Sequence, residues 1–381
     1  MESGKTHVLR FRKPSESIVA AEFRSAVSLH SHTMHSREYL GRLPSYIARV
    51  PIASLVIERE IGRLHLYTGR VFDFRRIFWT PPLSPREAME LEEGQIRTST
   101  GLRPLVSLTD HDNIEAGLHL RMLGSFSDVP VSVEWSVPFR GSVFHLGIHN
   151  VPIRSATQWM EEFSRFTASP STESLQGLLY ELAADPQVLI VLNHPYWDAE
   201  AAAPGHHEEA LSRFLVDYGK LIHALEINGM RSRRENRAVL QLAAALDLPA
   251  ISGGDRHGCE PNAILNLTSA TTFAEFAEEI RAGRQSTVLL MPQYFDNLRL
   301  RLLESSWHAL SDAPGEFGRR HWMTRIFCED ENGVPRPLSE FTGTRFQRVV
   351  DKFRWIMALL ASPQMRPALR LALLGSEEAS L

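Results

Sequence analysis

Ala26-Val27-Ser28-Leu29-His30-Ser31-His32 is a short, mostly apolar run that ends abruptly in two histidines. The run is too short for a helix, but it fits a buried strand of a parallel sheet. In an extended segment, side chains two residues apart lie on the same face, so His30 and His32 have the spacing needed to hold one cation. This segment therefore predicts a strand with a metal-binding pair at its end.

The same pattern recurs six more times along the chain. The apolar runs are 105–109 before Asp110-His111, 129–133 before Glu134, 143–148 with His145 inside and His149 after, 188–192 before Asn193-His194, 223–225 before Glu226, and 248–252 before Gly253-Gly254-Asp255-Arg256-His257. Most are separated by segments with helical character: one opened by Ser84-Pro85, then 155–166, 172–184, 208–218 and 232–246. A hairpin-like Pro138-Phe139-Arg140-Gly141 joins the third and fourth runs. Seven strands that alternate mainly with helices predict an α/β fold, as a closed or nearly closed barrel.

Two segments do not fit this repeat. Residues 39–83 are too long for a connection between a strand and its helix, so we expect an inserted cap or subdomain, with extended segments at 54–57 and 62–67. Residues 296–381 are expected to form a helical C-terminal appendage that packs against a barrel of residues 1–295.

Composition excludes several classes of protein. The 381 residues carry 41 Lys+Arg against 45 Asp+Glu, a formal charge of −4, which argues against a general nucleic-acid binder or an electrostatic membrane binder. The two cysteines, Cys259 and Cys328, exclude a disulfide scaffold and a thiolate zinc cluster. There is no signal-peptide pattern at residues 1–17 and no run of 18 apolar residues. We therefore expect a soluble cytoplasmic protein with no membrane partner.

The histidines and carboxylates at the strand ends indicate a metal site. In α/β barrels, active-site residues lie at the C-terminal ends of the strands, which is where these side chains fall. Asp255 and His257 repeat the i, i+2 spacing of the first pair, and Glu134 has two carboxylate oxygens with which to bridge two ions. Together these features predict more than one metal ion.

Taken in order, these motifs resemble those of the polymerase-and-histidinol-phosphatase (PHP) family. The resemblance spans roughly residues 25–292, with 39–83 inserted, and it includes His30-Ser31-His32, Thr109-Asp110-His111, Glu134, Asn193-His194-Pro195 and Ser252-Gly253-Gly254-Asp255-Arg256-His257. It implies a distorted seven-stranded (β/α) barrel that binds two or three zinc, manganese or iron ions. It also implies hydrolysis of phosphate mono- or diesters.

The resemblance implies three groups of metal ligands. The first metal would be held by His30, His32, Glu134 and Asp255. The second would share Glu134 and add His194 and a histidine of the fourth strand, for which we favour His145 over His149. The third would use His111, His257 and a residue after the first motif. Here the chain departs from the family pattern by reading His35-Ser36-Arg37-Glu38, and Glu38 is preferred, with His35 as the alternative.

Other polar residues receive supporting roles. Arg256 is a candidate phosphate contact, although a salt bridge to a neighbouring carboxylate is the structural alternative. Arg140 and Arg231 are weaker candidates for the same role. Asp110 and Glu226 are expected to orient ligand histidines, and His257 would assist the leaving group if it does not bind metal.

The leading hypothesis is a phosphoesterase in which a metal-bridging hydroxide attacks a small phosphorylated substrate or nucleotide. An exonuclease-like activity on nucleic-acid ends is one alternative, which the balanced charge makes less favourable. A metal-stabilised scaffold without activity is another. Amide hydrolysis by a barrel enzyme is disfavoured, because Glu134 fills the bridging position and no lysine lies near a strand end.

Overall fold

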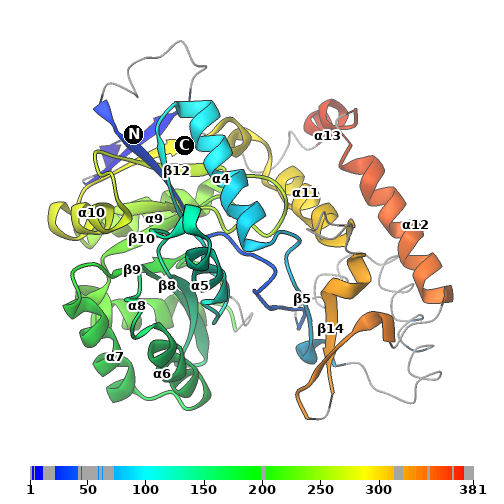
Figure 1. Cartoon of the computed structure of the whole chain (residues 1–381), viewed down its shortest axis with the longest axis horizontal. Helices are drawn as coiled ribbons and strands as arrows, with labels where there is room; N and C mark the ends of the chain where they lie inside the picture. Colours follow the sequence, from blue (N-terminus) through cyan, green and yellow to red (C-terminus); the bar gives the residue numbers. More distant parts are fainter. Residues whose placement is uncertain are drawn as a thin grey trace.

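The computed structural model describes residues 2–3, 5–11, 22–41, 73–198, 203–312, 321–330, 332–340, 344–362 and 364–372, with the single positions 44, 59 and 62. Its larger part consists of two sheets flanked by helices (Figure 1). A smaller sheet, labelled by β5 and β14 in Figure 1, lies to one side with the last helices.

The first sheet has six strands in the order β1-β2-β13-β12-β3-β6. Their bounds are Glu2–Ser3 (β1), Thr6–Arg10 (β2), Ser286–Leu290 (β13), Ile264–Thr268 (β12), Ser25–Leu29 (β3) and Arg103–Ser107 (β6). β3 is parallel to β6, but β12 runs antiparallel to both β3 and β13. All five residues of β3 are buried, and a strand covered on both faces favours a mostly apolar sequence, as Ala26, Val27 and Leu29 show.

The second sheet has five strands in the order β11-β10-β9-β8-β7. Their bounds are Ala250–Gly253 (β11), Ala224–Asn228 (β10), Leu189–Asn193 (β9), Ser142–His149 (β8) and Val133–Phe139 (β7). β9, β10 and β11 are parallel, whereas β8 is antiparallel to both β7 and β9. The predicted hairpin is confirmed: Arg140 and Gly141 turn the chain between β7 and β8 with φ of 50° and 77°, which is the backbone that a tight hairpin needs.

Ten helices are assigned in the described part of the chain. They are Pro85–Thr100 (α4), Glu115–Met122 (α5), Ala156–Ala168 (α6), Thr172–Ala184 (α7), His206–Tyr218 (α8), Arg233–Ala245 (α9), Phe273–Glu278 (α10), Leu298–Leu310 (α11), Thr344–Leu360 (α12) and Arg366–Ala372 (α13). The predicted helices are confirmed with bounds shifted by at most a few residues. Helices α6 to α8 bury apolar faces on the second sheet, where Trp135 of β7 stacks on Phe163 of α6 with ring centroids 4.4 Å apart.

The prediction of a seven-stranded barrel was wrong. The fold is α/β, but none of the sheets in the described part of the chain closes. Antiparallel strands β12 and β8 replace the uniform parallel order that a barrel requires. Where a closed barrel would pair strands continuously, the two large sheets are joined at strand ends by isolated bridges, at Ser31–Arg256 and His111–Glu134. A run of apolar residues indicates a strand but not its direction. The sequence pattern therefore does not distinguish two mixed sheets from one parallel barrel.

The third sheet combines the predicted insertion with the predicted appendage. Its order is β15-β14-β5-β4, with bounds Pro335–Pro337 (β15), Ile326–Glu329 (β14), Ile77–Trp79 (β5) and Glu38–Tyr39 (β4), and every pair is antiparallel. The C-terminal part is therefore not helical throughout, because it supplies two strands. The predicted segments 54–57 and 62–67 lie outside the described residues, save for Gly62. Among the helices that the structure describes, none has both the length and the apolar composition to cross a bilayer.

Candidate metal centre

The site forms where β3, β6, β9, β10 and β11 end and β7 begins. Backbone hydrogen bonds hold these ends together: the Asp255 N–H donates to the His30 carbonyl (2.7 Å), and the Asp112 N–H donates to the Glu134 carbonyl (2.9 Å). Glu134 thus reaches the centre from the start of β7, not from the end of a strand as the sequence run suggested. Six histidines and three carboxylates are brought together there: His30, His32, His111, His145, His194, His257, Glu38, Glu134 and Asp255.

Glu134 lies at the middle of this cluster. Its side chain is fully buried, and five imidazoles lie within 3.4 Å of its two oxygens. Oε2 faces His30 (2.9 Å), His32 (3.3 Å) and His111 (3.4 Å), while Oε1 faces His194 (3.1 Å) and His145 (3.4 Å). A carboxylate with different imidazoles at each oxygen has the arrangement of a ligand that bridges two ions.

Asp255 and Glu226 complete the inner part of the centre. Asp255 Oδ1 lies 3.8 Å from His30 Nε2 and 3.6 Å from His32 Nε2. Glu226 Oε2 accepts a hydrogen bond from His30 Nδ1 at 2.6 Å, which leaves the lone pair of His30 Nε2 directed at the centre. Gly253 and Gly254 are required here, because a Cβ on Gly253 would overlap Glu226 and one on Gly254 would overlap Asn262.

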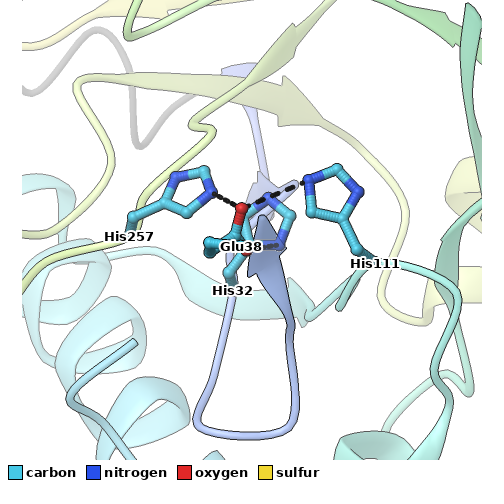
Figure 2. Close-up of side chains that lie close together, drawn as sticks. All are labelled: His32, Glu38, His111 and His257. Atoms are coloured by element: carbon cyan, nitrogen blue, oxygen red, sulfur yellow. Dashed lines mark ion pairs between the residues drawn. The ribbon is translucent and has the colours of Figure 1, made fainter. Parts of the chain in front are cut away.

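The outer group consists of His32, Glu38, His111 and His257, whose ligand atoms lie within 4.8 Å of one another. Glu38 Oε2 is 3.2 Å from His257 Nε2 and 3.6 Å from His111 Nε2, and the three side chains point toward one another (Figure 2). His257 donates from Nδ1 to the Asp255 carbonyl at 2.8 Å, so its Nε2 keeps a free lone pair facing Glu38. The preferred residue Glu38 therefore lies in the cluster, whereas the alternative His35 pairs with Glu115 at 3.0 Å.

The side of the centre that faces solvent follows from exposure. The side chains of His30 and Glu134 are fully buried, whereas those of His111 and His257 are 17% and 20% exposed. The outer group is therefore the side of the centre that solvent reaches.

The side chains present fit a metal. Among the described residues, buried His32 Nε2 and His145 Nδ1 have no hydrogen-bond partner, although buried polar atoms are normally satisfied. Each atom faces a carboxylate oxygen, His32 Nε2 that of Asp255 at 3.6 Å and His145 Nδ1 that of Glu134 at 3.4 Å, separations that two ligands of one ion would have. Imidazole and carboxylate together are ligands for zinc, manganese and iron.

The backbone is strained at three of these residues. φ is 59° at His30, 26° at His194 and 53° at Asp255. These values lie in the left-handed region, which residues other than glycine rarely adopt. Such conformations cost about 1–3 kcal/mol each and persist where the surrounding structure enforces them. The three turns occur directly after β3, β9 and just beyond β11, so each places a side chain at the junction of the sheets.

The charges of the centre are strongly coupled. Burial would raise the pKa of Glu134, but the imidazoles of His30 and His111 hold it well below its ordinary value. Burial lowers the pKa of His111 to about 3. Burial also opposes protonation of His32, but Asp255 and Glu134 raise its pKa to about 10. Without metal, the carboxylates thus hold a proton on His32, so we expect metal binding to release protons and to weaken at low pH.

No protein-family model and no curated protein matches this chain. Solved structures resemble it weakly. PsfC from Pseudomonas syringae PB-5123 is 14% identical over 53% of this chain and 81% of its own, with a TM-score of 0.34. An amidohydrolase from Chromobacterium violaceum, solved with sulfate and no metal, is 15% identical over 46% of this chain and 83% of its own, with a TM-score of 0.35. A protein from Bifidobacterium adolescentis, assigned as a metal-dependent phosphoesterase, is 15% identical over 54% of this chain and 92% of its own, with a TM-score of 0.33. Likenesses of this degree assign no activity.

Three predicted residues lie elsewhere. His149 hydrogen-bonds Ser107 at 2.8 Å and is absent from the ligand clusters of the described residues. Arg256 is 1% exposed and pairs with buried Glu92 at 3.0 Å, so its charge is used within the core and not at the centre. In the described part of the chain, Asp110 accepts hydrogen bonds from the Thr33 hydroxyl (2.7 Å) and N–H, not from a histidine ring, and these bonds fix the turn after His32.

Arg231, a weak candidate in the sequence, lies at the edge of the centre. Its guanidinium stacks on Trp197 at 4.5 Å and reaches Asp255 Oδ2 at 3.3 Å. Trp197 in turn contacts the ring of His194 with centroids 5.1 Å apart. The sequence positions of Arg231 and Trp197 are the signal that could have identified both residues, because each lies three residues after a strand-end motif. Arg140, the other weak candidate, lies in the hairpin turn at the far end of β7 and β8.

Proposed function

We propose that this chain is a metal-dependent hydrolase that acts on phosphate esters, with two or three divalent ions, zinc, manganese or iron, at the candidate metal centre. The observation that carries the proposal is the fully buried Glu134 carboxylate with five imidazoles around its two oxygens. Burying so many ionisable groups is costly unless they are paired or coordinate metals. Glu134, His30, His194 and Asp255 would hold the inner ions, while Glu38, His111 and His257 would hold the outer one.

The ions would supply a hydroxide at neutral pH and neutralise phosphoryl oxygens. The residues of the chain do the rest. Glu226 fixes the ring of His30 through Nδ1, and the Asp255 carbonyl fixes that of His257. Arg231 is positioned to contact phosphoryl oxygens, because its guanidinium lies at the edge of the centre and arginine offers a fork suited to phosphate. His257, at 20% exposure, would assist the leaving group if no ion occupies its Nε2, because Nε2 could then carry the proton that passes to the departing alkoxide.

A small phosphorylated compound or nucleotide fits this chain better than a nucleic acid. Grooves that bind nucleic acids normally carry a basic stripe, whereas the formal charge here is −4. Arg231 brings one guanidinium to Asp255 at the edge of the centre, which suits a single phosphoryl group better than a phosphate backbone.

Glu134→Gln tests the centre directly. The substitution removes the shared negative charge while keeping the shape of the side chain, so we expect it to lower the bound metal and abolish hydrolysis. Elemental analysis and turnover of a phosphoester panel after reloading with Mn²⁺ or Zn²⁺ would measure both. Glu115→Gln, at an exposed carboxylate on α5, is the matched control. Metal content and turnover equal to wild type in Glu134→Gln would overturn the proposal.

The same panel, extended with amides and oligonucleotides, separates the competing functions. Turnover of amides but not phosphoesters would replace phosphoester hydrolysis with amide hydrolysis at the same centre. Bound metal without turnover of either class would favour the scaffold. Degradation of oligonucleotide ends in preference to small phosphoesters would favour the exonuclease.

A further inference from the structure

Glu38 reaches the outer group from a different sheet than its partners. His32, His111 and His257 follow strands β3, β6 and β11 of the two large sheets. Glu38 belongs to β4, a strand of two residues in the third sheet, so its position depends on whatever holds that sheet in place.

Strand β4 is held by β5, and β5 is held by β14. Glu38 is opposite Trp79, and Tyr39 is opposite Phe78, with a further hydrogen bond from the Leu40 N–H to the Ile77 carbonyl (2.8 Å). Phe78 is in turn opposite Phe327 of β14, and the two rings stack with centroids 5.2 Å apart. Two- and three-residue strands are not stable alone, so β14 supplies the support that β4 and β5 lack.

Side chains reinforce this path directly. The Tyr39 hydroxyl, next to Glu38, donates to Glu329 Oε1 of β14 at 2.8 Å. Arg37, on the other side of Glu38, lies 3.9 Å from the same Glu329 oxygen. Both neighbours of Glu38 are thus tied to β14.

Strand β14 is itself fixed to the main body. Arg325, which precedes β14 and is 2% exposed, donates to the carbonyls of Ala309 (2.9 Å) and Ser311 (2.6 Å) at the end of α11. Helix α11 contacts the loops of the centre, because Arg301 donates to the Gly229 carbonyl and His308 pairs with Glu260 at 2.7 Å. These contacts form a continuous path from the loops after β10 and β11, through α11, β14 and β5, to Glu38.

We propose that β14 positions Glu38 and thereby controls whether the outermost metal position is filled, with Phe327 and Tyr39 as the positioning residues. The inference rests on the metal centre proposed above. Within the described part of the chain, the inner positions have no ligand on the third sheet, so we expect their affinity to be independent of β14.

Phe327→Ala in the full chain tests this inference, because it removes the ring that supports Phe78. Metal stoichiometry by elemental analysis, and Mn²⁺ or Zn²⁺ affinity by competition with a chelator, are the readouts. We expect wild type to bind three ions and Phe327→Ala to bind the outermost ion about 10–100-fold more weakly, as when groups that orient ligands are removed. The two inner ions should keep their affinity. Phe327→Leu should restore most of the outer affinity, and Tyr39→Phe should show a smaller loss.

The matched control is Trp355→Ala, which removes an exposed aromatic ring from α12 in the same C-terminal part without touching β14. If both Phe327→Ala and Tyr39→Phe bind three ions at wild-type affinity, the role of β14 is overturned while the proposed function stands. Equal weakening of inner and outer ions would also overturn the role of β14. If Phe327→Ala does not fold, Tyr39→Phe decides, because it removes only one hydroxyl. A wild-type chain that binds no metal would overturn the proposed function itself, and one that binds only two ions would overturn the outer position.

Discussion

Arg231 and Arg256 follow neighbouring strands, yet they have opposite surroundings. Arg256 is enclosed with Glu92, Gly258 and the hydrogen bonds of Asn262, and it has 1% exposure. Arg231 lies on a partly exposed tryptophan beside Asp255. One arginine therefore pairs within the core, and the other has the place that the proposed phosphate contact requires.

Substituting each by methionine should separate these roles. Arg256→Met leaves Glu92 buried without its partner, so the free energy of unfolding should fall by about 3–5 kcal/mol. Arg231→Met should instead lower kcat/KM for a phosphoester by about 10–100-fold, mainly through KM, which corresponds to a charged hydrogen bond of about 1.5–3 kcal/mol. Denaturant unfolding and steady-state kinetics measure the two effects. Arg234→Met, at an exposed position of α9, controls for loss of charge. The opposite pattern would contradict both assignments.

Sequence reasoning at this scale found the residue types but not all of the directions. It placed His145 and His149 on one face of a strand, which is correct for residues four apart, but such residues are about 13 Å apart along the strand. The register decides between them: His145 is opposite Asn193, next to His194, while His149 is opposite Leu189, near the start of β9. That pairing is a long-range property that no local pattern contains.

At the scale of elements, local signals predicted the helices well. Ser84 caps α4 by accepting from the Glu87 N–H, and the Glu87 side chain returns the interaction to the Ser84 N–H at 2.8 Å. These contacts form between residues three apart, so the sequence alone contains them.

The sequence pattern located strands only where ionisable residues lie near one of their ends. Strand β12, Ile264–Thr268, was missed because it runs antiparallel to β3 and its C-terminal end therefore points away from the centre. Strands β2 and β13 were missed for the lack of any such residue pattern. The sequence pattern thus predicted the strands near the candidate metal ligands. Because the other strands were not predicted, the mixed sheets resembled a barrel.

Ser84→Ala tests the predicted helix start. Loss of the cap leaves N–H groups of the first turn of α4 unsatisfied, so the free energy of unfolding should fall by about 1 kcal/mol. Denaturant unfolding monitored by circular dichroism measures the change. Ser125→Ala, at an exposed position outside any α-helix, should have no measurable effect. A Ser84→Ala chain as stable as wild type would show that tertiary packing alone holds this helix end.

At the scale of the whole molecule, one histidine far from the centre links stability to pH. Burial lowers the pKa of His223 to about 3, with help from the charges of Arg281 and Arg284, and its Nδ1 accepts from the Ile190 N–H at 2.9 Å. The folded chain keeps this ring neutral, whereas the unfolded chain protonates it below about pH 6.5. Its contribution is therefore fully present above pH 6.5 and is lost as the pH falls toward 3.

His223→Asn should remove this contribution while keeping a hydrogen-bond acceptor near the position of Nδ1. Between pH 6 and pH 4, wild type should lose up to about 1.4 kcal/mol per pH unit more than the variant. Urea unfolding of both chains across this range measures the difference, and the other histidines cancel in the comparison. His7→Asn, the same substitution at an exposed histidine of β2, is the control. Parallel stability profiles in wild type and His223→Asn would contradict the assignment.

The contact between Tyr39 and Glu329 also has a consequence in time. The two residues are 290 positions apart in the chain. A ribosome adds about 5–20 residues per second, so roughly 15–60 s separate their synthesis. The ligands on the two large sheets can assemble during that interval, but Glu38 is not held in position until β14 has been synthesised. A nascent chain that has already captured inner ions would therefore acquire its outermost one last, after β14 has emerged.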